Sequence, residues 1–160
     1  MTYFTLDELT RSQTARLLGL DNTPCEAHLR NLGELAERML DPLREAWDAR
    51  CRAGGLGAGG VRVSSGYRSD ALNKAVGGAP TSAHRYGFAA DLVPVNGHLA
   101  AFRDCCAEFL RGRDFDQLIS EREDAAGTPR WVHIGYRSGD GRQRRQMLSL
   151  RDGRYRPLGE

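Results

Sequence analysis

Two short segments of the chain contain residue types that bind divalent metals. His84 and Asp91 lie seven residues apart in the first segment, and His133 lies in the second. Gly87 permits backbone angles that other residues avoid, so His84 can lie on a loop just before the chain enters a strand. Asp91 would fall inside that strand, within the apolar run 88–93. A carboxylate in such a run is unfavourable unless a cation neutralises it.

His133 occupies a comparable position in the apolar, β-rich run 131–136. Neighbouring antiparallel strands would direct His133 and Asp91 to one face of a sheet. Two histidines and one aspartate are three of the four ligands of a catalytic zinc ion, whose fourth position is open to water. We therefore predict one Zn²⁺ on His84, Asp91 and His133. The alternative is a buried aspartate with ordinary partners and two unrelated histidines, which is the better account of each residue taken alone.

The order and spacing of these residues resemble a known enzyme family. The segments are Ser82-x-His84-x-x-Gly87-x-Ala89-x-Asp91, then Trp131-Val-His133, with Ser65-Gly-Tyr-Arg68-Ser upstream. They are similar to the zinc D-alanyl-D-alanine carboxypeptidase family of bacterial cell-wall peptidases, which includes phage endolysins, over about residues 64–136. The resemblance implies zinc on the three ligands, Arg68 in contact with the substrate or its developing oxyanion, and the hedgehog-like metallopeptidase fold.

One position departs from the family pattern. Several relatives carry the catalytic acid or base three residues before the last histidine, where this chain has Arg130, which cannot take a proton from water. Glu121 is the predicted substitute, because it closes the strand-like run 115–121 and a short hairpin to Trp131 would bring it near His133. The alternative for Glu121 is a solvated carboxylate at a strand end.

Strand alternation ranks the acidic residues of this run. Glu121 shares a face with Gln117, whereas Asp116 points to the opposite face and is the weaker candidate. Gln117 and Tyr86 are candidates for the cleft wall, with Gln117 as a substrate-binding residue. Ser82 is a second substrate-binding candidate, which would hydrogen-bond either the substrate or a metal ligand.

Length and pattern predict a single domain, 1–160, in which a helical region, 1–53, precedes a catalytic sheet region, 61–160. No apolar run is long enough to span a membrane. The predicted fold class is α+β, a small mainly antiparallel sheet with helices packed on one side. The first helices are expected to begin at the capping boxes Thr5–Glu8 and Thr23–Glu26, and the second of them to divide near Pro42. Further helices are expected over 70–76 and 97–111. Further strands are expected over 61–64, 115–121 and 131–136, and as a closing hairpin over 146–156.

Four cysteines show no zinc-knuckle spacing and are predicted to be free thiols, with Cys105 and Cys106 as small buried hydrophobes. Free thiols indicate synthesis in a reducing compartment. The N-terminus has neither a basic nor an apolar signal region, so we expect a protein made in the cytoplasm without a signal peptide, which acts on the cell wall after release.

Arginine is enriched near the C-terminus, with seven arginines in residues 137–160. Such a segment could adhere to an anionic wall polymer, although a solvated face is the simpler explanation. Nucleic-acid binding is not expected, because the chain has no known binding module and no interleaved aromatic residues.

These observations predict a zinc metallopeptidase that acts as a monomer. Glu121 would accept a proton from water, while zinc and Arg68 would stabilise the oxyanion. The substrate comes from the resemblance alone: peptidoglycan stem peptide, cut by a D,D-carboxypeptidase or endopeptidase of the endolysin type. An L-Ala-D-Glu endopeptidase is the close alternative. A non-catalytic zinc-containing wall-binding module is another, which Arg130 favours.

Overall fold

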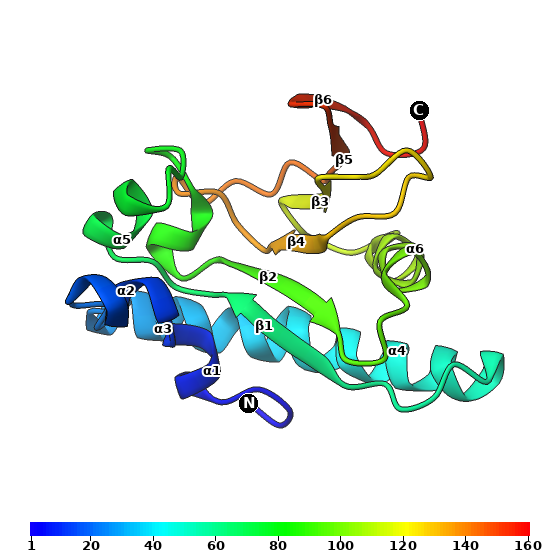
Figure 1. The fold of residues 1–160 in the computed structure, drawn as a ribbon. Helices are drawn as coiled ribbons and strands as arrows, with labels where there is room; N and C mark the ends of the chain where they lie inside the picture. The colour runs from blue at the N-terminus through cyan, green and yellow to red at the C-terminus, as the bar shows by residue number, and fades with distance from the viewer.

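The centre of the fold is a six-stranded sheet in the order β1-β2-β4-β3-β5-β6, seen in a computed structural model that describes residues 1–160 (Figure 1). Every neighbouring pair is antiparallel except β3 and β5, which run parallel. The predicted α+β class and mainly antiparallel sheet are therefore confirmed. The strands are β1 (Val61–Ser65), β2 (Ala89–Pro94), β3 (Gln117–Glu121), β4 (Trp131–Gly135), β5 (Gln146–Arg151) and β6 (Arg154–Pro157).

Most of the helices precede the sheet in the chain. No helix combines the length and apolar character needed to cross a membrane. The helical elements are α1 (Leu6–Thr10), α2 (Gln13–Leu18), α3 (Glu26–Leu35), the π-helical turn η1 (Ala36–Leu40), α4 (Asp41–Gly54), α5 (Asp70–Ala75), the 3₁₀ turn η2 (Ala83–Tyr86) and α6 (Leu99–Leu110).

One face of the sheet shares a hydrophobic core with the long helices. Leu92 in β2 and Ile134 in β4 are fully buried in the same cluster as Leu40, Trp47 and Phe102. Trp47 of α4 meets Phe102 of α6 edge to face, with ring centroids 5.2 Å apart. Figure 1 shows α3 and α4 following one another alongside β1, and α6 packs against α4 and against β2, β3 and β4. Because side chains alternate along a strand, the sequence neighbours of Leu92 and Ile134 point to the opposite face.

The strand register brings polar residues together on that opposite face. Asp91 pairs with His133 across β2 and β4, and Ile119 pairs with His133 across β4 and β3. Two residues further along β3, Glu121 pairs with Trp131, which confirms the predicted hairpin, although its connection, 122–130, is longer than expected. These pairings place an aspartate, a histidine and a glutamate on three adjacent strands.

The two predicted capping boxes have different outcomes. Thr5 caps α1, since its hydroxyl accepts from the Glu8 amide at 3.2 Å and the Glu8 carboxylate accepts from the Thr5 amide at 2.8 Å. The box at Thr23 is wrong, because α3 begins at Glu26 behind Cys25 and has no side-chain cap. The Thr23 amide instead donates to Asp21, two residues upstream, at 2.9 Å.

The predicted division near Pro42 is confirmed, although the break is a π-helical turn rather than an interruption. The turn 36–40 joins α3 to α4 without leaving helical geometry, and Pro42, which has no N–H to donate, follows in the first turn of α4. The later helix begins at Leu99 rather than at Gly97, because Asn96 accepts from the His98 amide and forms a turn before it.

Candidate metal centre and active site

Three different local structures position the candidate metal ligands. His84 lies in η2, which ends at Gly87 with φ at +77°, a left-handed conformation that favours glycine. Asp91 lies in β2 and His133 in β4, directly opposite each other. The loop and the strand expected on either side of Gly87 are both present. All three side chains are buried.

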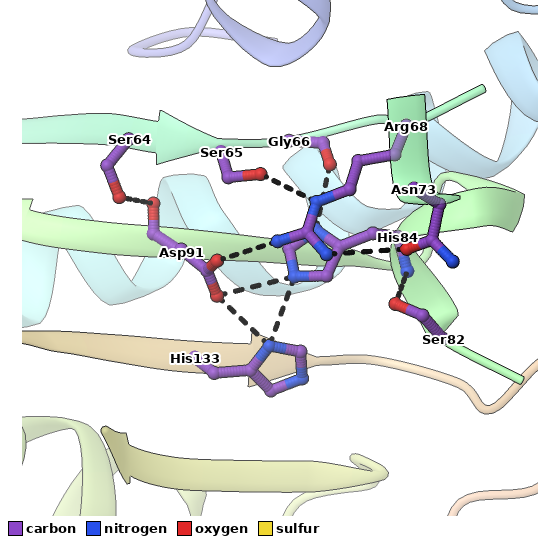
Figure 2. A network of polar contacts seen from close by, with 9 residues as sticks. All are labelled: Ser64, Ser65, Gly66, Arg68, Asn73, Ser82, His84, Asp91 and His133. Atoms are coloured by element: carbon purple, nitrogen blue, oxygen red, sulfur yellow. Dashed lines mark hydrogen bonds and ion pairs between the residues drawn. The ribbon is translucent and has the colours of Figure 1, made fainter. Parts of the chain in front are cut away.

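The ligand atoms of these residues form a nearly equilateral triangle (Figure 2). His84 Nε2 lies 3.3 Å from Asp91 Oδ1, and His133 Nδ1 lies 3.1 Å from the same oxygen. The two ring nitrogens are 3.2 Å apart. Tetrahedral zinc with bonds of about 2.0–2.1 Å holds its ligand atoms roughly 3.3–3.4 Å apart. The triangle therefore has the size that a tetrahedral ion of this kind requires.

The hydrogen bonding of His84 also fits a ligand role. Its Nδ1 lies 2.8 Å from the Gly66 carbonyl, which can only accept, so Nδ1 carries the proton and Nε2 presents a lone pair. This is the arrangement in which a backbone carbonyl fixes the tautomer of a metal-binding histidine. Gly66 is itself closely packed, because a Cβ built on it would lie 2.2 Å from the Leu9 carbonyl oxygen.

The electrostatic environment favours the protonation states that bind metals. Burial opposes ionisation of Asp91, but its contacts with His84 and His133 outweigh burial and hold the pKa of Asp91 well below its usual range. Burial lowers the pKa of His84, an effect partly offset by Asp91. A carboxylate and a neutral imidazole are the forms in which these side chains bind a cation.

Arg68 lies at the corner between β1 and α5, where the sequence places it, and its side chain is 16% exposed. It contacts the second oxygen of Asp91 at 3.3 Å and donates to the Ser65 hydroxyl at 3.0 Å (Figure 2). Its amide donates to the His84 carbonyl at 3.0 Å. Arg68 therefore forms a salt bridge with a candidate metal ligand rather than with a surface carboxylate.

A cleft of about 330 Å³ opens over the triangle. The remaining predicted site residues Arg68, Ser82, Gln117 and Glu121 all line it. Tyr86 does not, and lies instead in a neighbouring hollow, so its predicted place in the cleft wall is wrong. Lining residues that the sequence did not single out are Ile119, Ser138, Arg144 and Tyr155, together with Ala79, Thr81 and Ala83.

The cleft contains one carboxylate that forms neither an ion pair nor a hydrogen bond with another side chain. Asp91 belongs to the triangle, and both oxygens of Asp116 are bound by Arg144 at 2.8 and 2.9 Å. Glu121 has no such partner, and burial raises its pKa above the ordinary value of 4.5 while His133 opposes the shift. An acceptor of this kind, close to a metal site and easily protonated, is suited to general base chemistry.

Asp116 and Arg130 lie just outside β3 and β4, where the alternation of strand side chains no longer applies. Asp116 lines the cleft despite the expected opposite orientation, because β3 begins only at Gln117 and the alternation does not reach it. Arg130 is exposed and lies outside the cleft, and its amide donates to the Glu121 carbonyl at 2.9 Å. The position that carries the acid in several relatives is therefore a hairpin residue here.

Comparison with known proteins identifies the family. A sequence model described as Peptidase M15 matches residues 2–135, which include all three residues of the triangle as well as Arg68 and Glu121. Compared with curated protein sequences, the chain has no significant match. The match covers most of the chain and coincides with a histidine–aspartate–histidine cluster that could bind a metal, and we conclude that this protein belongs to the M15 peptidase family of metallopeptidases.

Proposed function

We propose that the protein is a zinc-dependent peptidase that hydrolyses peptidoglycan stem peptides, as a D,D-carboxypeptidase or endopeptidase of the cell-wall-lytic, endolysin-like type. The observation that carries the proposal is the triangle of His84, Asp91 and His133 atoms, 3.1–3.3 Å apart, at the base of a cleft. One zinc ion bound there would supply a Lewis acid for the peptide carbonyl and would acidify water.

Glu121 is the proposed proton carrier. Its carboxylate would accept a proton from the water that attacks the peptide carbon and would return it to the leaving nitrogen as the C–N bond breaks. The raised pKa supports this role, because a more basic carboxylate takes a proton from water more readily and can still pass it to the leaving amine, which is more basic than any carboxylate. The other cleft carboxylates are unsuitable, since Asp91 and Asp116 are already engaged.

Arg68 is the proposed oxyanion or substrate-carboxylate partner. Its guanidinium has five N–H donors, and Asp91, Ser65 and Asn73 engage it from the protein side. A half-buried cation on the cleft wall can stabilise negative charge that develops on a substrate oxygen more strongly than a solvated one could. The contact with Asp91 would fix its direction.

Ser82 and Gln117 are proposed to assist binding. The Ser82 hydroxyl accepts from the His84 amide at 3.3 Å, which supports a role in holding the turn that presents His84. The Gln117 side-chain nitrogen donates to Gln146 at 2.8 Å, which leaves the Gln117 amide oxygen free to accept from a peptide N–H in the cleft.

Mass spectrometry of digested muropeptides tests the proposal. With zinc, the wild-type protein should release D-alanine or split D,D cross-links, and Glu121→Gln should not. Fragments that begin at the second stem residue would identify the L-Ala-D-Glu endopeptidase instead. Wall binding without any new amino groups would refute the enzyme and support the binding module, the alternative that Arg130 motivates.

A further inference from the structure

A second cleft, of about 440 Å³, continues from the proposed active site. The two clefts share Arg68, Asp91 and Trp131, so the second cleft adjoins the metal triangle. Its walls come from the segment between α1 and α2, from the end of β1 and from the hairpin residue Arg122. A peptide that crosses the triangle would therefore extend into this second cleft.

The second cleft is cationic. It is lined by three arginines, Arg11, Arg68 and Arg122, and its single carboxylate is Asp91, which already contacts Arg68 and the histidines. Arg11 is paired with Asp7 at the surface. Arg122 is the one arginine of the three that forms no ion pair with the protein.

Arg122 has an acidic residue on each side in the sequence, Glu121 and Glu123, and it forms an ion pair with neither. Glu123 is 7% exposed and binds Arg103 at 3.1 Å and Arg151 at 3.4 Å, on the other side of the hairpin. Arg122 instead lies over the ring of Trp131, with 5.2 Å from its guanidinium carbon to the ring centroid. A guanidinium stacked in this way keeps the N–H groups on its edge available for a planar anion.

The backbone of Arg122 fixes this placement. Its φ is +49°, a left-handed conformation that non-glycine residues rarely adopt, and it directly follows Glu121. Since Glu121 and Trp131 are opposite each other in the β3–β4 ladder, the turn holds the Arg122 side chain against the strand that carries His133.

We propose that Arg122, supported by Trp131, binds a carboxylate of the peptide substrate and makes the protein selective for acidic peptides. The inference rests on the proposed peptidase function and adds the substrate's charge to it. Arg122 acts as a specificity-determining residue, through a charge-assisted, two-pronged hydrogen bond to a carboxylate that flanks the cleaved bond. Replacing that carboxylate by a carboxamide should weaken the contact by about 10- to 100-fold.

The test compares two muropeptides that are identical except that one carries a free carboxylate and the other a carboxamide on the residue next to the cleaved bond. Wild type should prefer the carboxylate by roughly 10- to 100-fold in kcat/KM, mainly through KM. Arg122→Gln should lose the preference for the carboxylate, and Arg122→Lys should recover part of it. Arg130→Gln is the matched control, because Arg130 is a nearby exposed arginine that lines neither cleft.

Binding to the zinc-loaded Glu121→Gln variant, measured by calorimetry, separates this inference from the peptidase proposal. If wild type cuts neither peptide but the inactive variant still binds the carboxylate form 10- to 100-fold more tightly, only the proposed reaction fails. If wild type cuts both peptides equally well, or if Arg122→Gln with an unchanged melting temperature retains the preference, the role of Arg122 is refuted.

Discussion

Replacing Glu121 with glutamine removes the one cleft carboxylate that forms no ion pair within the protein, and it changes the shape of the site very little. The side-chain volume is conserved, and Glu121 is not a member of the metal triangle, so one metal per chain should remain bound. Loss of a general base lowers kcat by about 10²- to 10⁴-fold, which corresponds to roughly 3–5 kcal/mol in the activation barrier. Since burial already disfavours the Glu121 carboxylate, the melting temperature should not fall.

The assay is single-turnover release of amino groups from a muropeptide, with metal content measured on the same sample. A double variant, Glu121→Gln with Arg130→Glu, places an acid where several relatives carry it. It should stay inactive, because residue 130 is exposed on the hairpin and lies outside the cleft. Full activity of Glu121→Gln, or recovery in the double variant, would refute the assignment of the proton carrier to Glu121.

Three further outcomes follow from the same structure. Gly66→Ala would place a Cβ too close to the Leu9 carbonyl oxygen and would displace the Gly66 carbonyl, which fixes the His84 tautomer. The variant should therefore have a lower melting temperature and a zinc affinity lower by about 10- to 100-fold. An unchanged zinc affinity in a competition titration would contradict this. Burial depresses the pKa of His84 in the folded protein below 6.5, so in acid the unfolded chain binds one proton more at this residue than the folded protein does. The urea midpoint of the metal-free protein should therefore fall as the pH drops below 6.5. A midpoint that stays constant or rises down to pH 5 would be inconsistent with a buried neutral imidazole. Cys25 is the exposed thiol, so one thiol per chain should react with a disulfide reagent under native conditions and four after unfolding; a second rapidly reacting thiol would show that the core opens.

Local chemistry made several features of the fold predictable. The capping box at Thr5 and the glycine at position 87 are each determined by residues within three positions along the chain. Side chains alternate between the two faces along a strand, and this alternation likewise determines the face that Asp91 and His133 occupy. In these cases the interaction that decides the structure is short-range.

Contacts between distant segments escaped prediction. Arg144 binds Asp116 across 28 residues, and nothing in the arginine-rich tail distinguishes this arginine from its solvated neighbours. The parallel pairing of β5 with β3 also has no local signature, although it brings Tyr155 to the cleft. At Thr23 a competing hydrogen bond to Asp21 won over the capping pattern.

The second cleft also escaped prediction, because segments far apart in the sequence form it. Its lining combines the α1–α2 segment with a hairpin about 110 residues later in the chain, and Glu123, next to Arg122, pairs with Arg103 instead. Such a choice of partner depends on tertiary packing, which a linear pattern of charges does not encode.

The most direct test of the central claim is metal stoichiometry with X-ray absorption at the zinc edge, on wild type and on Asp91→Asn. Wild type should bind one zinc ion per chain with two imidazole nitrogens and oxygen in its coordination sphere. Asp91→Asn should remain folded and lose most of the metal, since it removes the charge that two histidines and Arg68 surround. A wild-type protein without zinc affinity, or a variant that keeps one zinc ion with the same ligands, would contradict the account.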